Sequence, residues 1–297
     1  MSSIYVFPGQ GAQAVGMGKD LYENNADARA VFDEMDTALG EKLSDIIFNG
    51  PIETLTMTAN VQPAILATSV AMYRAAKIPM ADYVAGHSLG EYTALCIAGA
   101  ISLVDAIKLV RLRGESMQNA VPLGQGAMAV ILGLEYDALK TVCEQAEKDT
   151  GKICDIANDN CPGQIVISGN NDAIERAMEI AKENGARRAM KLALSVPPHS
   201  RLMMPVADIM KTALDNIEIK EPIVPIISNK TCQPMTNVNE IKDALIYQIT
   251  HGVRWRESVL SMVDMGITDL TEIGPGNALI GMVNRTTDKI TTHKLEI

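Results

Sequence analysis

The stretch VAGHSLGEYTALCIAGA, residues 84–100, sets a serine between two glycines where an apolar run gives way to an alanine-rich segment. Its centre, GHSLG at 86–90, fits the pattern G-x-S-x-G, in which a serine stands on a tight turn between a strand and a helix. We therefore expect a strand over 82–88 and a helix over 89–100. Free N–H groups and the dipole of that helix would favour a developing oxyanion beside the serine. Ser88 is a candidate nucleophile, and a small residue in a structural turn is the alternative.

Strands and helices are expected to alternate on both sides of this turn. The β-branched and aromatic run at 4–7 ends in a Pro-Gly loop and predicts a buried strand. A helix is expected over 60–77, with Pro63 tolerable only in its first turn. This alternation is typical of a mainly parallel sheet covered by helices. Near the C-terminus we expect helices over 201–217 and 240–253, a strand over 222–229, and a final strand and turn within 267–276.

The middle of the chain has a different order of elements. We expect strands over 127–134, 153–159, 164–169 and 187–195, with helices over 135–149 and 171–185. This β-α-β-β-α-β order is the ferredoxin-like supersecondary unit. The predicted fold class is therefore α/β, with an α/β-hydrolase-like catalytic domain containing a parallel sheet (residues 1–124 and 197–297) and an inserted ferredoxin-like small domain (residues 125–196).

Composition and charge exclude several classes of protein. The chain of 297 residues is 47% hydrophobic, which is enough apolar material for a sizeable core. No apolar run reaches the roughly 18 residues that span a bilayer, and no secretion signal is recognisable, so we expect a cytoplasmic protein without a membrane partner. A formal charge of −10 disfavours binding to nucleic acid. The 5 cysteines are scattered without a CxxC pair, so we expect free thiols and no metal site.

A nucleophilic serine needs a base, most often a histidine, and the chain has only 4 histidines. His87 adjoins the serine within the turn, where neighbouring side chains diverge, and His293 lies close to the C-terminus. His251 is interpreted as a helix-terminal residue. His199 follows two prolines in SVPPHS, on a stiff loop at the seam between the two predicted domains. It is therefore the preferred base.

An acyl-transfer intermediate needs two backbone N–H donors for its oxyanion. The N–H of Leu89, directly after the candidate nucleophile, is expected to be one of them. The early turn FPGQGAQ, residues 7–13, is suited to supply the second through the N–H of Gln10. An ordinary glycine-rich turn is the alternative for that segment.

Eight blocks follow one another along the chain: FPGQGAQ, GHSLGEYTAL, RLRGESMQ, GAMAVILGL, NDNCPGQIVISG, SVPPHS, ISN and EIGPG. Together they closely resemble the malonyl-CoA:acyl carrier protein transacylase family over essentially the whole chain. The resemblance implies an acyltransferase for fatty acid biosynthesis. By a ping-pong route, Ser88 would take malonyl from malonyl-CoA as an ester and pass it to the phosphopantetheine thiol of acyl carrier protein. Coenzyme A is then part of a substrate, and no cofactor is implied.

The resemblance also implies roles for four further residues. Arg113 matches an arginine that grips the free malonyl carboxylate, which a planar guanidinium can bind through two parallel hydrogen bonds. Gln248 matches a glutamine that helps to orient the histidine in place of the acid of a triad, so a Ser-His dyad is implied. Asn158 and Asn160 match polar residues that face the site, and turn residues are the alternative. The predicted substrate-binding residues are thus Arg113, Gln10, Asn158 and Asn160.

Other functions share parts of this pattern. A trans-acting polyketide-synthase acyltransferase would look alike, and a serine esterase or thioesterase shares the serine turn and the base. A carrier-protein docking module with a vestigial serine would not be an enzyme. A buried cation at Arg113 would discriminate against the hydrolases, because it penalises neutral acyl chains.

An acidic partner would need a local basic patch on this acidic chain. The densest cluster is ARRAMK, with Arg187, Arg188 and Lys191, which is a candidate docking patch for acyl carrier protein. A solvated strand or helix edge is the alternative for these residues.

Overall fold

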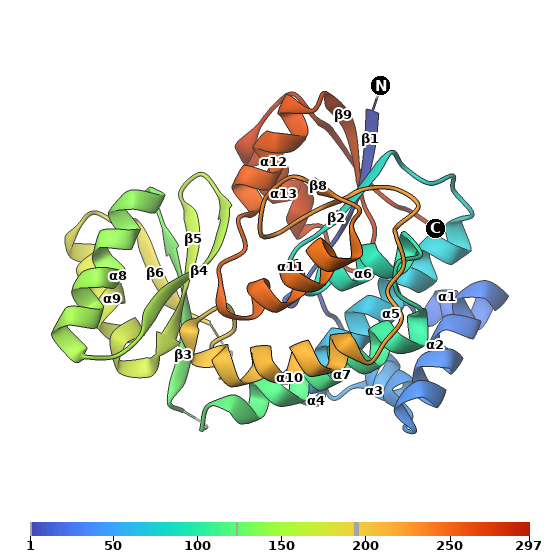
Figure 1. The fold of residues 1–297 in the computed structure, drawn as a ribbon, viewed down its shortest axis with the longest axis horizontal. Helices are drawn as coiled ribbons and strands as arrows, with labels where there is room; N and C mark the ends of the chain where they lie inside the picture. Colours follow the sequence, from blue (N-terminus) through green and yellow to red (C-terminus); the bar gives the residue numbers. More distant parts are fainter. Residues whose placement is uncertain (1, 123, 193–195) are drawn as a thin grey trace.

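A computed structural model describes residues 2–122, 124–192 and 196–297, and its two sheets lie side by side with helices packed against each (Figure 1). The larger sheet has six strands, in the order β10 (Thr291–Lys294), β9 (Ile267–Glu272), β1 (Ser2–Phe7), β2 (Tyr83–Gly86), β7 (Ile226–Ile227) and β8 (Pro234–Met235). All neighbouring pairs are parallel except β7 and β8. The expected parallel sheet is therefore present, with one short antiparallel strand at its edge.

Helices cover both faces of the larger sheet. In the first half of the chain they are α1 (Lys19–Asn24), α2 (Ala26–Leu39), α3 (Leu43–Asn49), α4 (Ile52–Thr56), α5 (Thr58–Ala76), α6 (Leu89–Ile97) and α7 (Leu103–Ala120). Near the C-terminus they are a 3-10 turn at Arg201–Met203, α10 (Met204–Asp215), α11 (Val238–Thr250), α12 (Trp255–Asp264) and α13 (Ala278–Thr286).

Strand β1 has apolar side chains on both faces of the sheet, so helices must pack against each face. Its side chains alternate, so Tyr5 and Phe7 pack into the core formed with α5, α6 and α7. Ile4 and Val6 pack on the opposite face with residues of α12 and α13. A parallel strand that is buried on both faces reads as a continuous apolar run, which is what the sequence has at 4–7.

The smaller sheet has four antiparallel strands in the order β4 (Cys154–Cys161), β5 (Gln164–Asn170), β3 (Gly126–Leu132) and β6 (Arg188–Lys191). Helices α8 (Tyr136–Thr150) and α9 (Asn171–Glu183) pack their apolar stripes against one face of this sheet. The opposite face carries Met128, Ala157 and Val166. Two of these side chains, Met128 and Val166, line a cavity that the sheet shares with the larger sheet's helices.

Backbone hydrogen bonds join strand β4 of the smaller sheet to the segment between α11 and α12. The N–H of Val253 donates to the carbonyl of Ala157 at 2.9 Å, and the N–H of Asp159 donates to the carbonyl of Val253 at 2.9 Å. Arg256 adds an ion pair from α12 to Asp159, with Nε 2.9 Å from Oδ2. The expected helix over 240–253 therefore ends at Thr250, because the residues that follow pair with β4 instead.

Several other expected elements differ from the structure in their bounds. Helix α5 begins at Thr58, so Pro63 lies in its second turn and not in its first. The strand expected over 222–229 is reduced to β7, because Pro222 and Pro225 have no N–H to give to a sheet. Strand β6 is shorter than expected over 187–195, and residues 193–195 of that prediction lie outside the described residues. Helices α1–α4, α12 and α13 and strands β8 and β10 were not predicted, and no bounds were predicted for α7.

Two expectations from composition can be compared with the structure. In the part of the chain that is described, no helix is long and apolar enough to cross a membrane. All 5 cysteines are free thiols, and only Cys96 is partly exposed. The expectation of free, mostly buried thiols is therefore confirmed.

The serine turn is built on two glycines that admit no side chain. A Cβ on Gly86 would lie 1.8 Å from the carbonyl carbon of Gly90, and a Cβ on Gly90 would lie 2.0 Å from the carbonyl oxygen of Phe7. Because neither glycine carries a side chain, α6 can start directly against β1. Ser88 itself has φ 54 and ψ −108, a strained conformation for a residue with a side chain. The predicted strand, turn and helix are all present.

Replacing Gly90 with alanine is expected to destabilise the protein strongly. The new methyl group would meet backbone, which cannot move aside as a flexible side chain can, so we expect a loss of at least about 3 kcal/mol in the free energy of unfolding. Gly281→Ala in α13 is the control, because a Cβ there meets nothing within 4 Å. Denaturant unfolding should find the control within about 1 kcal/mol of the original protein. Equal stabilities for the two variants would contradict this account of the turn.

Candidate active site

Ser88 and His199, 111 residues apart in sequence, are hydrogen-bonded, with Oγ 2.7 Å from Nε2. The other ring nitrogen of His199, Nδ1, lies 2.6 Å from the backbone carbonyl of Gln248. A carbonyl only accepts, so Nδ1 carries the hydrogen and Nε2 is left to accept the hydroxyl proton of Ser88. The histidine is therefore held in the tautomer that a general base requires.

The other three histidines are engaged elsewhere. His87 Nε2 lies 2.9 Å from Asn160 Oδ1, and the His251 ring stacks on Tyr247 with centroids 3.7 Å apart. His293 lies at the edge strand β10, with Nε2 3.7 Å from Asp269 Oδ1. Of the four imidazoles, all within the described residues, only that of His199 is hydrogen-bonded to Ser88.

Arg113 extends from α7 to the same serine and is only 2% exposed. Its Nη2 donates to Ser88 Oγ at 3.1 Å and to Gln248 Oε1 at 2.9 Å, and its Nη1 donates to Gln62 Oε1 at 2.7 Å. The guanidinium also lies over the ring of Tyr92, 5.7 Å from the centroid.

No carboxylate among the described residues forms an ion pair with Arg113, and none of these residues places an acceptor in hydrogen-bond geometry with its Nε. Burial lowers the pKa of this guanidinium, which remains a cation because arginine loses its proton only far above neutral pH. The nearby Tyr92 hydroxyl, which also has no partner in hydrogen-bond geometry among the described residues, opposes the effect of burial on the pKa of the guanidinium. The site therefore holds a buried positive charge with open donor capacity beside a nucleophile.

Gln248 acts differently from its expected role. It was expected to orient His199, and the orienting contact comes from its backbone carbonyl, not from its amide side chain. The side chain bridges Arg113 and Glu91, because its Nε2 donates to Glu91 Oε2 at 2.5 Å. A prediction based on side-chain chemistry alone misses this division of roles.

Glu91 and Asn229 are two site residues that sequence reasoning missed. Glu91 is fully buried in α6, and its Oε1 accepts the backbone N–H of Asn229 at 2.9 Å. Asn229 accepts the N–H of Ser88 at 3.0 Å through Oδ1 and donates to the carbonyl of Gly86 at 2.7 Å through Nδ2. The one available signal was a charged residue inside an apolar helix, and the ISN block gave no indication of a contact with the serine turn.

Burial is the main cause of two large pKa shifts in this cluster. It lowers the pKa of His199 to about 3, and the nearby charge of Arg113 contributes in the same direction. It raises the pKa of Glu91 to about 7, against the opposing effects of its hydrogen bonds and of Arg113. His199 is therefore a neutral imidazole throughout the physiological range of pH.

A cavity of about 350 Å³ opens onto these groups between the two sheets. All eight predicted site residues except Gln248 line it: Ser88, Leu89, His199, Gln10, Arg113, Asn158 and Asn160. Its apolar wall includes Met117, Met128, Val130, Val166, Leu192, Leu279 and Met282. Residues from both predicted domains therefore meet at one site.

The two expected oxyanion donors also face this cavity. Leu89 is the first residue of α6, and neither its N–H nor that of Gln10 donates to another group among the described residues. The side-chain Nε2 of Gln10 is buried and has no partner either. Free donors at a helix start beside a serine are the arrangement that stabilises a tetrahedral oxyanion.

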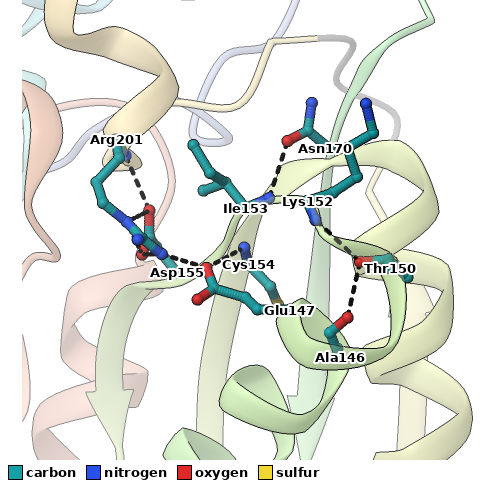
Figure 2. Close-up of polar contacts among 9 residues, drawn as sticks. All are labelled: Ala146, Glu147, Thr150, Lys152, Ile153, Cys154, Asp155, Asn170 and Arg201. Carbon is teal, nitrogen blue, oxygen red and sulfur yellow. Dashed lines mark hydrogen bonds and ion pairs between the residues drawn. The ribbon is translucent and has the colours of Figure 1, made fainter.

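The loop that carries His199 is fixed to the smaller sheet by Arg201 (Figure 2). The backbone N–H of Arg201 donates to Asp155 Oδ2 at 2.8 Å, and its Nε donates to Asp155 Oδ1 at 2.9 Å. Its Nη2 also pairs with Glu147, whose Oε1 accepts the N–H of Cys154 at 2.9 Å. His199 has φ 60, a strained conformation for a residue with a side chain, and these contacts hold the backbone directly after it.

A second cavity of about 440 Å³ lies beyond His199 and shares only that residue with the first. Its walls include Arg201 and Arg254, which are already paired with Asp155 and Glu257. Ser88 and Arg113 are absent from its lining. The candidate nucleophile and the buried cation therefore share the smaller cavity.

The predicted basic patch lies at the outer edge of the smaller sheet. Arg187 and Arg188 are exposed, whereas Lys191 pairs with Glu175 at 3.0 Å. Among the described residues, no group of three or more His, Cys, Asp or Glu side chains is placed to hold a metal ion.

The chain matches the acyl transferase domain family over residues 4–296. It is 49% identical to the malonyl CoA-acyl carrier protein transacylase of Bacillus subtilis over 295 residues, covering 98% of this chain and 93% of that protein. It is 43% identical to the protein of the same name from Escherichia coli, covering 98% and 94%.

Solved structures agree with these sequence matches. The acyl-carrier-protein S-malonyltransferase from Bartonella henselae superposes with a TM-score of 0.97 at 45% identity, covering 100% of this chain and 96% of that one. A malonyl-transacylase in complex with a type II polyketide-synthase acyl-carrier protein superposes with a TM-score of 0.95 at 40% identity, covering 99% and 95%.

The protonation state of His199 provides a test of this site. With its pKa lowered from 6.5 to about 3, the native imidazole should stay neutral with hydrogen on Nδ1 from pH 8 down to pH 5. An unfolded chain takes up this proton near 6.5, so the native state should lose stability as pH falls from there toward 3. Nitrogen-15 NMR of the imidazoles would distinguish the neutral ring of His199 from its imidazolium. The His199→Gln variant would assign the signal. An imidazolium midpoint above pH 5 would contradict the burial argument.

Proposed function

Since the chain belongs to the acyl transferase family, in which it is 43–49% identical to malonyl CoA-acyl carrier protein transacylases, we propose that it transfers malonyl from coenzyme A to acyl carrier protein for fatty acid biosynthesis. The observation that carries the choice of malonyl is Arg113, a buried cation 3.1 Å from Ser88 Oγ with no carboxylate partner among the described residues. The enzyme is an acyltransferase, and its two substrates bind in turn.

In the first half-reaction Ser88 attacks the thioester carbonyl of malonyl-CoA. As the Oγ–C bond forms, the hydroxyl proton passes to Nε2 of His199, for which the 2.7 Å hydrogen bond is support. The carbonyl oxygen becomes an oxyanion that accepts the N–H groups of Leu89 and Gln10. Collapse of the intermediate breaks the C–S bond, and the proton on His199 leaves with the coenzyme A thiol.

In the second half-reaction the phosphopantetheine thiol of acyl carrier protein attacks the seryl ester. His199 takes the thiol proton, the same two N–H groups hold the oxyanion, and the proton returns to Ser88 as the C–O bond breaks. The backbone carbonyl of Gln248 stabilises the transient imidazolium through Nδ1, so a Ser-His dyad with a main-chain acceptor replaces a triad.

Arg113 selects the acyl group. The malonyl carboxylate would take the free Nε–H together with the Nη2–H that now reaches Ser88, which is a side-on bidentate pair. A neutral acyl chain would leave the guanidinium buried and unpaired, at an estimated cost of roughly 3–5 kcal/mol. Asn158, Asn160 and Gln10 are assigned to the remaining polar contacts with the substrate.

A serine esterase or thioesterase is disfavoured because such enzymes do not need this cation. Polyketide synthesis is a second candidate, favoured by the similar structure solved with a type II polyketide-synthase acyl-carrier protein. Both candidates involve the same malonyl chemistry and differ only in the carrier. Exposed Arg187 and Arg188 are the proposed docking cations for the carrier, whereas Lys191 would have to leave Glu175.

We also propose the division into a catalytic domain (1–124 and 197–297) and a small domain (125–196). The strand order β4-β5-β3-β6, with α8 and α9 on one face, supports a ferredoxin-like description of the small domain. The strand, strained serine and helix at β2 and α6 support the α/β-hydrolase-like description of the large one. A cytoplasmic location and activity without a metal or redox cofactor are further parts of the proposal.

The proposal predicts a covalent intermediate on Ser88. After brief mixing with malonyl-CoA, intact mass spectrometry should find one added malonyl group, which is lost when acyl carrier protein is supplied. Ser88→Ala should take up none, and Ser200→Ala is the control, because Ser200 is also buried but bonds to the carbonyl of Pro197. Labelling by acetyl-CoA and not by malonyl-CoA would overturn the assigned specificity.

A further inference from the structure

Glu91 occupies the centre of a hydrogen-bonded chain behind the serine. Its Oε1 accepts the N–H of Asn229 at 2.9 Å, and its Oε2 accepts the amide Nε2 of Gln248 at 2.5 Å. The Oε1 of Gln248 accepts Nη2 of Arg113 at 2.9 Å. The carboxylate is fully buried and has no part in the proton transfers between Ser88 and His199.

The direction of every hydrogen bond in this chain is fixed. Arg113 and the backbone N–H of Asn229 can only donate. Gln248 must therefore turn its oxygen toward Arg113 and its nitrogen toward Glu91. Both oxygens of Glu91 then face donors, so this geometry favours the ionised carboxylate and opposes the burial that raises its pKa to about 7.

The same carboxylate supports the serine turn. The N–H of Asn229 that Glu91 accepts belongs to the residue whose side chain holds the N–H of Ser88 at 3.0 Å and the carbonyl of Gly86 at 2.7 Å. Gln248, its other partner, also presents the carbonyl to His199. The Glu91 side chain thus bonds to Asn229, which holds the turn of the nucleophile, and to Gln248, which contacts both the base and the cation.

We propose that Glu91 is a positioning residue that sets the selectivity for the malonyl group, by fixing the Gln248 amide so that its oxygen holds Arg113 toward the acyl pocket. Glu91 is separated from Arg113 by that amide. It balances the buried cation without occupying the guanidinium edge that an incoming carboxylate needs. The inference rests on the proposed malonyl transfer and adds to it a determinant outside the cavity.

Glu91→Gln is the direct test, because it keeps the size of the side chain and changes only the hydrogen-bond polarity. If the new amide turns its oxygen to Asn229, its nitrogen faces the nitrogen of Gln248. If Gln248 then turns over, its nitrogen faces Arg113. If the new nitrogen instead faces Asn229, two N–H groups meet there. One donor pair is opposed in every arrangement, so the hydrogen-bonded chain that orients the guanidinium is weakened.

We expect the ratio of kcat/KM for malonyl-CoA to kcat/KM for acetyl-CoA to fall by about 10-fold or more in Glu91→Gln, the effect of one hydrogen bond to a charged group. This ratio does not depend on the fraction of enzyme that is folded. Glu115→Gln is the matched control, an exposed glutamate on the same helix as Arg113. A ratio within two-fold of the unaltered enzyme would overturn the proposal and leave Glu91 a structural residue.

The double variant Glu91→Gln/Gln248→Glu tests the polarity argument without relying on activity. Its amide at 91 can donate to the carboxylate at 248 and accept from Asn229, and that carboxylate can accept from Arg113. We expect Glu91→Gln to lower the melting temperature and the double variant to recover at least half of the loss. The ratio of kcat/KM for malonyl-CoA to kcat/KM for acetyl-CoA should stay low, because the new carboxylate at 248 would pair with the Arg113 guanidinium in place of the malonyl carboxylate.

A double variant that melts below both single variants would contradict the fixed polarity of the chain. Failure of the proposed function gives a different result, since the unaltered enzyme itself would then show no preference for malonyl-CoA over acetyl-CoA. In that case the melting temperatures would still report on the role of Glu91 in the hydrogen-bonded chain.

Discussion

The buried guanidinium of Arg113 is the constraint on which the rest of the site depends. An isolated charge inside a protein costs several kcal/mol unless other groups compensate it. Here the compensation comes from two amide oxygens, the hydroxyl of Ser88 and the face of Tyr92, with Glu91 one amide further away. These partners keep the cation in place, yet its Nε stays free. A ligand that brings its own carboxylate therefore gains more here than a neutral one does.

The same charge affects the chemistry of the dyad. It lies close enough to His199 to add to the effect of burial on the imidazole pKa, which keeps the base neutral. It also donates to Ser88 Oγ, so that an oxygen losing its proton to His199 gains a positive neighbour. In the proposed mechanism, substrate selection and activation of the nucleophile share one side chain, and Glu91 joins the same hydrogen-bonded network through Gln248.

Much of the fold and of the reacting atoms could be predicted from the sequence. The turn at Ser88 requires glycine at positions 86 and 90, because backbone atoms lie within 2.0 Å of where a Cβ would stand at either position. The base could be found by elimination because there are only 4 histidines. The role of Arg113 required the resemblance, since an arginine on a helix is usually a surface residue, and its position on the buried face of α7 could not by itself assign it a ligand. Short helices such as α1, α3 and α4 have too few residues for a periodic signal.

Glu91, Asn229 and the backbone carbonyl of Gln248 could not be predicted in the same way. Their roles arise from contacts across 138 and 157 residues of sequence, where no spacing rule applies. The measurement that tests the central claim most directly is the loading of Arg113→Met by malonyl-CoA and by acetyl-CoA. The account predicts that malonyl loading falls by about 100-fold or more, the scale of a lost buried ion pair, while acetyl loading is unharmed or improved. An equal loss for both thioesters would contradict it.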